Sequence, residues 1–175
     1  MNDPRNFDHL GEVTDVKQRA QMLDEALDIL VGLWSGKPFS YSGKHYQIDE
    51  VTFLPKPVQS PRIPLWIGGG WPGKPIQRAV KWDGFIPYKN PSSGHREDMT
   101  AEDVSAMKVY LESRRTTPAP FDLAIGGRQR GPDWEQERAL IRSLAEAGAT
   151  WSMEHLPPAD LKTMREWVKQ GPLRI

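Results

Sequence analysis

Residues 65–75 read LWIGGGWPGKP, which is a short apolar run, three glycines and a basic turn bounded by prolines. The apolar run at 65–67 is too short for a helix and predicts a β-strand, whereas residues 75–82 predict a helix. A strand that leads directly into a helix is typical of a βα unit. The fold class that this stretch predicts is α/β.

The same order of strand and helix recurs three times toward the carboxyl end. Thr100, Asp133 and Asp160 are each a suitable cap for one of the helices. A polar loop at 90–94 separates the second strand from its helix. The strands are predicted at 84–86, 121–125 and 149–153, and the helices at 100–115, 133–147 and 160–169. Four βα units in succession predict parallel strands joined by right-handed crossovers.

The amino-terminal part has a different pattern. Residues 1–14 show no periodicity and predict an extended lead-in. The next stretch, to Trp34, repeats apolar side chains at intervals of three and four, which predicts a helix capped by Thr14 or Asp15. Aromatic-rich runs at 39–41 and 45–48 flank a turn and predict a β-hairpin. Four prolines at 54–64 then predict an extended connector.

Composition narrows the possible functions. The 175 residues carry 23 basic and 23 acidic side chains and no cysteine. Zero net charge gives no reason to expect a nucleic-acid partner, and the lack of cysteine excludes disulfides and thiolate metal sites. The four histidines lack metal-ligand spacing, so no metal is expected. The longest apolar stretch, at 26–34, is too short to span a membrane, and we expect a cytoplasmic protein.

The glycines at 68–73 match two phosphate-binding motifs incompletely. Gly68, Gly70 and Gly73 satisfy GxGxxG, and the stretch from Gly68 to Lys74 satisfies GxxxxGK. Pro75 stands where a P-loop needs a hydroxyl, and residues 87–90 lack the carboxylate that a dinucleotide site needs. Two interpretations remain. Backbone N–H groups with Lys74 could bind an anion, or the turn could need glycine torsions only.

Two further candidates follow the later strands. Arg128 and Arg130 lie among glycines at 126–131, either as a phosphate site or as a solvated basic turn, and we favour the turn. Glu154 and His155 end the fourth strand, where α/β enzymes place acid–base groups. Exposed polar residues are the commoner explanation there. Four tryptophans at core spacings are interpreted as packing residues: Trp66, Trp82, Trp151 and Trp167.

Several stretches together are more specific than any of these motifs. The pieces lie, in order, at 19–27, 33–36, 41–46, 51–59, 62–69 and 82–84. With these the chain resembles the C-terminal half of the bacterial luciferase-like monooxygenase family, which includes flavin- and F420-dependent oxidoreductases. Residues 121–127 and 146–151 are similar to the last two strands of that family.

This resemblance implies that residues 15–175 form half of a (β/α)₈ barrel domain, with the helix and hairpin as an insertion before its later strands. It implies FMN or F420 as cofactor, with the phosphate end at Gly68, Gly69 and Gly70 near Lys74. The end of the next strand, with Tyr88 and Lys89, would face the same opening of the barrel. These residues would lie on the side of a small-molecule substrate, which the sequence does not identify. Arg128 and Glu154 are weaker candidates for that side. No catalytic residue is assigned.

The number of βα units determines which alternative functions have to be considered. Four βα units are visible where the barrel needs eight, and such barrels typically need about 250 residues. A half barrel has two open edges, so we expect a homo-oligomer. The chain is then a luciferase-like oxidoreductase or its C-terminal portion. The alternatives are an inactive, truncated half-barrel that serves as an oligomerisation or partner-binding module, and a generic binder of phosphate ligands.

Overall fold

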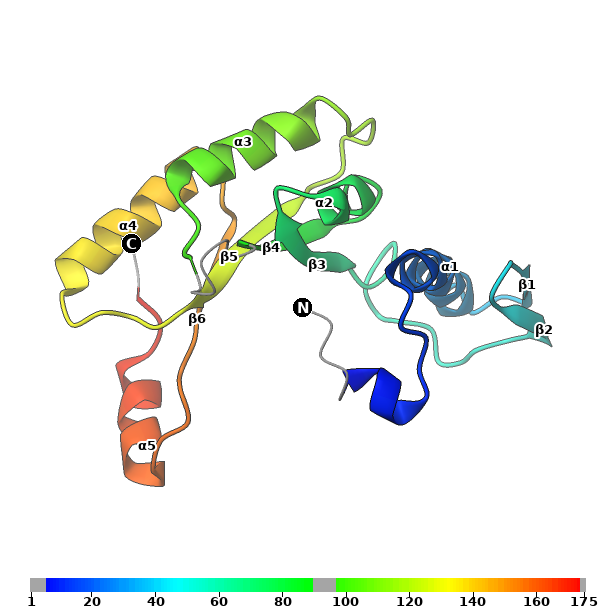
Figure 1. Ribbon diagram of the computed structural model, residues 1–175, viewed down its shortest axis with the longest axis horizontal. Coiled ribbons are helices and arrows are strands. Elements are labelled where there is room, and N and C mark those ends of the chain that lie inside the picture. The colour runs from blue at the N-terminus through cyan, green and yellow to red at the C-terminus, as the bar shows by residue number, and fades with distance from the viewer. Residues whose placement is uncertain (1–5, 90–96, 174–175) are drawn as a thin grey trace. The chain divides into compact units, whose positions relative to one another are not determined.

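The computed structural model describes residues 6–89 and 97–173 (Figure 1). The polar loop predicted at 90–94, His95 and the first five residues of the lead-in lie outside the described residues. The chain divides into two compact units, Met1–Ile63 and Pro64–Ile175. Each unit is described separately below.

The first unit contains the predicted helix and hairpin. Helix α1 spans Val16–Trp34, and the Asp15 carboxylate caps it by accepting the backbone N–H of Gln18 at 2.6 Å. Strands β1 (Phe39–Ser42) and β2 (Gln47–Val51) pair antiparallel, as expected. Within the lead-in, where extended chain was expected, Asp8–Leu10 forms a short 3₁₀ helix.

One carboxylate fastens the hairpin to α1. Glu25 accepts the backbone N–H groups of Lys44, His45 and Tyr46 at 2.9–3.1 Å. Desolvation acts to raise the pKa of Glu25, but these three hydrogen bonds hold it below its usual value. Residues 52–65 contain no helix or strand, which confirms the predicted connector.

The second unit is the predicted α/β part. Its strands are parallel, in the order β3-β4-β5-β6, and a helix follows each of them. This confirms four βα units. The elements are β3 (Trp66–Trp71), α2 (Lys74–Ala79), β4 (Gly84–Lys89), α3 (Ala101–Glu112), β5 (Asp122–Arg128), α4 (Trp134–Ala147), β6 (Trp151–Glu154) and α5 (Leu161–Gln170).

All four strands extend beyond their predicted carboxyl ends, and two of the extensions contain glycines. The predicted loop at 68–70 belongs to β3, and Gly126 and Gly127 belong to β5. In a parallel sheet, hydrogen bonds to the neighbouring strand can keep glycine within the ladder. Here the lack of a side chain also lets residues of the neighbouring strand pack closely against the glycine. A Cβ on Gly126, for example, would lie 2.5 Å from the Cβ of Met153 on β6. The interpretation as turn residues is wrong for the glycines at 68–70 and for Gly126, whereas Gly127 has a φ of 91° and stands at a register shift between β5 and β6.

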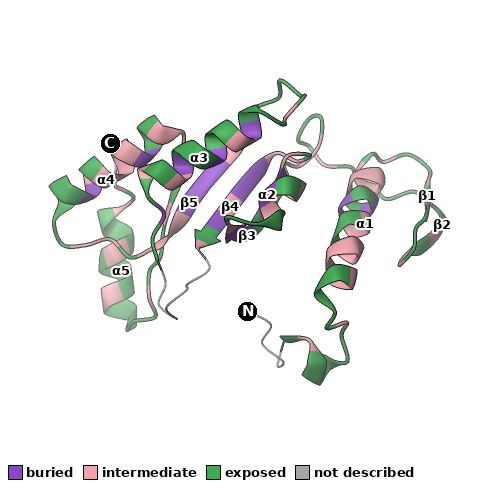
Figure 2. Ribbon diagram, turned by 45° about the horizontal axis from the view of Figure 1, so that its top comes forward, coloured by how far each residue is buried: buried purple, intermediate pink, exposed green. Residues whose placement is uncertain are grey.

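One face of the sheet carries the core. Ile67, Phe85 and Leu123 are register partners on β3, β4 and β5, and all three are buried. Because paired residues of parallel strands point to the same face, this row defines the covered side. The helices α2, α3 and α4 contribute the other buried residues: Ile76, Ala79, Val104, Met107, Leu111 and Leu144. Figure 2 shows these buried segments where the helices meet the sheet.

The opposite face is concave and largely open. Trp66 on β3 and Trp151 on β6 are separated by two strands, yet their ring centroids lie 5.6 Å apart. Such a contact requires a strongly curved sheet, because flat neighbouring strands alone lie about 4.8 Å apart. The mixed α/β architecture with a curved parallel sheet is compatible with part of a (β/α)₈ barrel. The closed barrel stays a prediction.

Candidate functional site

The candidate residues lie at the carboxyl ends of the strands. The ladder between β3 and β4 covers six residue pairs, but that between β4 and β5 covers only Gly84 with Asp122 and Phe85 with Leu123. Beyond these pairs the sheet divides into two pairs of strands. The predicted cofactor glycines at 68–70 lie on the first pair, Lys74 begins the helix after β3, and Arg128 and Glu154 lie on the second pair.

A strip without side chains runs along the concave face of β3. Gly68 and Gly70 are register partners of Ile86 and Tyr88. Gly68 is exposed, and a Cβ built on it would meet nothing within 4 Å. Tyr88, beside the strip, is 50% exposed. The packing of this chain therefore does not require glycine at position 68. The strip is accessible at Gly68, on a face with an exposed phenol, whereas Gly70 is buried.

Gly69 has a different role, because it faces the helices. A Cβ on Gly69 would overlap the ring of Pro75 at the start of α2. None of the three glycines has a positive φ, so the alternative that this stretch needs glycine torsions is wrong. Lys74 is the first residue of α2 and is exposed. Lys74 thus follows the strip closely in the sequence, and its side chain is accessible to solvent.

Lys89 is engaged in a structural contact. Its Nζ lies 2.7 Å from the Asp103 carboxylate, which also accepts the backbone N–H of Thr100 at 3.0 Å in the capping box of α3. The hydrogen bond to Asp103 raises the pKa of Lys89. Desolvation acts to raise the pKa of Asp103, but the bonds from Lys89 and Thr100 keep it lowered. Lys89 therefore joins the end of β4 to the start of α3.

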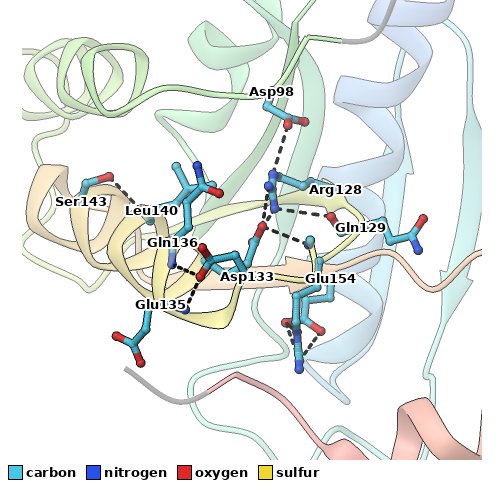
Figure 3. A network of polar contacts seen from close by, with 12 residues as sticks. Asp98, Arg128, Gln129, Asp133, Glu135, Gln136, Leu140, Ser143 and Glu154 are labelled. Atoms are coloured by element: carbon cyan, nitrogen blue, oxygen red, sulfur yellow. Dashed lines mark hydrogen bonds and ion pairs between the residues drawn. The ribbon is translucent and has the colours of Figure 1, made fainter.

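Arg128 is held by two carboxylates (Figure 3). Its Nη2 donates to Glu137 at 2.7 Å, its Nη1 donates to the other oxygen of Glu137, and its Nε lies 3.2 Å from Asp98. Glu137 is 5% exposed and also accepts the backbone N–H of Gly131. A buried carboxylate needs such partners. The guanidinium thus compensates a buried charge, and the interpretation of this loop as a solvated turn is wrong for Arg128.

Glu154 forms the second ion pair of this cluster. Its carboxylate accepts from Nε and Nη2 of Arg130 at 2.7–2.9 Å, and Nη2 also donates to the carbonyl oxygen of Gly171. Arg128 and Glu154 are register partners, so the two ion pairs lie side by side at the ends of β5 and β6. Arg130, Glu154, Trp134 and Trp167 line a cavity of about 390 Å³, a volume in the range of small-molecule sites.

The sequence reasoning missed the acidic partners of these cations. Glu137 and Asp103 belong to the first turns of α4 and α3, where acidic residues are expected for the helix dipole alone. The available signal was their position one turn after the caps Asp133 and Thr100. Within the described ranges, no three His, Asp or Glu side chains form a group that could hold a metal ion.

The predicted tryptophan packing is found at Trp66, which contacts Trp151, although Trp151 itself is 53% exposed.

Among the described residues, no helix is both long enough and apolar enough to cross a membrane. The cytoplasmic location stays a prediction.

Parallel βα units with polar groups gathered at the carboxyl edge define an α/β protein of the kind that binds ligands at that edge. The profile of the luciferase-like monooxygenase family matches residues 2–128, and the chain belongs to this family. The match ends at the last residue of β5. It includes the glycine strip, Tyr88, Lys89 and Arg128.

Two of the similar proteins are named F420-dependent glucose-6-phosphate dehydrogenase. The one from Kineococcus radiotolerans is 26% identical over 112 residues, which are 63% of this chain and 32% of that protein. The one from Microbacterium testaceum is 33% identical over 69 residues, 36% of this chain and 20% of that protein. An uncharacterised protein of Mycobacterium bovis is 29% identical over 122 residues, 70% and 38% of the two chains. The chain thus spans about a third or less of the first two relatives.

Proposed function

We propose that this chain contributes the phosphate-binding part of an oxidoreductase that uses F420 or a flavin. Membership of the luciferase-like family supports the class, and the names of two relatives favour F420 over FMN. The observation that carries the proposal is the exposed Gly68 on the concave face of β3, where a Cβ would meet nothing within 4 Å. A strand without side chains lets the backbone of the protein approach a bound group closely.

The residues on this face suit such a cofactor. Gly68 leaves open space in front of β3, and Lys74 supplies a cation that can pair with a phosphate. Tyr88 lies beside Gly70 and offers an aromatic ring and a hydroxyl on the same face. When bound, the cofactor supplies the hydride chemistry. The chain's part is to hold the phosphate end and to shape the wall beside it.

The substrate side is assigned to the second pair of strands. Glu154 lines the cavity of about 390 Å³, and its carboxylate is oriented by Arg130. Arg128 acts as a positioning residue, because its guanidinium is committed to Glu137 and Asp98. A small polar molecule in this cavity would contact Trp134 and Trp167 together with Glu154. Lys89 is not included, since Asp103 already holds it.

Cofactor titration tests the proposal. The chain is titrated with F420 and, separately, with FMN, and binding is followed by the change in cofactor fluorescence. Gly68→Val fills the open strip without meeting a neighbour, and we expect it to weaken binding at least about tenfold, a cost of about 1.4 kcal/mol. Lys74→Met should weaken binding by a factor of several because an ion pair with the phosphate is lost.

Lys81→Met is the matched control, because Lys81 is also exposed and lies just after α2. It removes the same charge and should leave binding unchanged. The proposal fails if neither cofactor binds, or if Lys74→Met and Lys81→Met have equal effects.

A further inference from the structure

The carboxyl end of β5 departs from the regular ladder. The register with β6 shifts between Gly126 and Arg128, and Gly127 has a φ of 91°. Such a shift redirects the side chains that follow it and is common beside binding sites. The Arg128 carbonyl oxygen still accepts the backbone N–H of His155 at 2.9 Å. The turn at residues 128–131 therefore begins from a backbone position that is fixed by β6.

A buried carboxylate holds this turn from the side of α4. Glu137 is 5% exposed, and its Oε1 accepts from Nη2 of Arg128 at 2.7 Å and from the backbone N–H of Gly131 at 3.0 Å. Its other oxygen accepts from Nη1 of Arg128. A Cβ on Gly131 would lie only 2.8 Å from Oε1, so glycine allows this close approach. Glu137 thus binds the first and the last residue of the turn.

Arg130 lies between the two residues that Glu137 holds. Its guanidinium donates to both oxygens of Glu154 at 2.7–2.9 Å, and its Cζ lies 4.9 Å from the ring centroid of Trp134. Arg130, Trp134 and Glu154 line the cavity of about 390 Å³, whereas Glu137 is not one of its lining residues. The direction of the Glu154 carboxylate in this cavity therefore depends on the backbone position of Arg130.

A buried ion pair contributes little net stability compared with well-packed apolar side chains. It does define a geometry, because two parallel hydrogen bonds between a guanidinium and a carboxylate fix the relative orientation of both groups. We propose that Glu137 is a positioning residue of the candidate site. It fixes the turn at 128–131, and through this turn it sets the place from which Arg130 orients the Glu154 carboxylate.

This inference rests on the proposed function only in the assignment of Glu154 to the substrate side. The dependence of Arg130 and Glu154 on Glu137 is a property of the folded chain, and it is measured without cofactor or substrate. A failed cofactor titration therefore removes the proposed function and leaves this inference standing. The two measurements below can in turn refute the inference in a chain that binds its cofactor.

The first measurement is ¹⁹F NMR of the full chain labelled with 5-fluorotryptophan, in which Trp134→Phe assigns the Trp134 resonance. Arg130→Met removes the cation over the Trp134 ring and gives the reference shift. We expect Glu137→Gln to move the Trp134 resonance in the same direction, because the turn no longer holds Arg130 in place. Gly131→Ala should do the same, since its new methyl group displaces the turn from Glu137.

Glu146→Gln is the matched control, because Glu146 is an exposed carboxylate on the same helix. It should leave the Trp134 resonance in place, and circular dichroism checks that every variant is folded. The proposal is overturned if folded Glu137→Gln and Gly131→Ala leave this resonance unmoved, or if Glu146→Gln moves it equally.

The second measurement is a double-mutant cycle, in which urea unfolding is compared for Glu137→Gln, Glu154→Gln and the double variant. For independent sites, the increases in the unfolding constant multiply to within about twofold. We expect the increase in the double variant to be at least about fivefold smaller than that product, because a well-placed Arg130 gains nothing once Glu154 has lost its charge. Increases that simply multiply would show that Glu137 serves stability alone, and the positioning role would then be wrong.

Discussion

The indole rings of Trp66 and Trp151 lie 5.6 Å apart across the concave face, although they belong to the two outer strands of the sheet. Gly84 makes room for this contact, because a Cβ there would lie 2.5 Å from Cδ1 of Trp66. Asp122 fixes the second ring by accepting the Trp151 Nε1–H at 3.0 Å. These side chains form a layer at the amino ends of the strands, which maintains the curvature on which the candidate site depends.

Removal of one ring should therefore destabilise the sheet. We expect Trp151→Ala to lower the free energy of unfolding by about 1 to 2 kcal/mol, because both the ring contact and the hydrogen bond to Asp122 are lost. Trp151→Phe keeps an aromatic ring and should lose only about 1 kcal/mol. Urea unfolding followed by circular dichroism measures both. Equal stabilities for the wild type and Trp151→Ala would mean that the ring contact is energetically unimportant.

The ion pair of Arg128 and Glu137 should be much more sensitive than a surface pair. Glu137→Gln leaves the guanidinium without its buried partner charge, and we expect a loss of about 2 to 4 kcal/mol in chemical denaturation. The double variant Arg128→Met with Glu137→Leu should lose less than the sum of the single losses, because both charges are removed together.

An exposed pair on the same helix provides the comparison. Glu135 and Arg138 lie one turn apart on α4, and the Glu135 side chain is exposed. Glu135→Gln should therefore cost less than about 1 kcal/mol. If Glu135→Gln and Glu137→Gln are equally destabilising, burial is not the reason for the importance of Glu137.

The contact between Lys89 and Asp103 should stabilise the chain over a limited range of pH. The pKa of Asp103 is lowered, so its contribution is present above its unfolded value of about 3.9 and is lost as pH falls through the lower folded value. The pKa of Lys89 is raised, so its contribution is complete below about 10.4 and is lost as pH rises through the higher folded value.

Asp103→Asn should accordingly cost about 1 kcal/mol near neutral pH and progressively less in acid. Unfolding curves at a series of pH values measure the difference from the wild type. Glu112→Gln, at an exposed carboxylate on the same helix, is the control and should cost less than Asp103→Asn near neutral pH. A difference that stays constant from neutral pH to strong acid would contradict the assignment.

The sequence was sufficient for the order and type of the elements, because apolar periodicity and caps such as Thr100 and Asp133 are local signals. The strand ends were predicted too short. Glycine at 68–70 and at 126 resembles a turn in a single sequence, and only the neighbouring strand shows that it continues the ladder. Element bounds are for this reason less predictable than element types.

The candidate site was predicted less completely than the fold. Lys89 and Arg128 were identified as polar groups at strand ends, which is a local property. Their ion pairs with Asp103 and Glu137 depend on how α3 and α4 pack beside the sheet. A local sequence pattern gives no information on the distances between these side chains. Of the three adjacent glycines, likewise, only the structure distinguishes Gly68, which faces open space, from Gly69, which faces Pro75.

That distinction yields a direct test of which glycine the fold itself requires. Gly69→Val places a branched side chain against the ring of Pro75, and we expect it to lower stability by about 1 to 3 kcal/mol or more. Gly68→Val meets no neighbour and stays in an extended strand that favours valine, so its stability should equal or exceed that of the wild type. Thermal unfolding of the two variants side by side measures the contrast. Equal destabilisation by both would show that Gly68 is also a packing residue, and the exposed position at Gly68 would then lose its support as a binding surface.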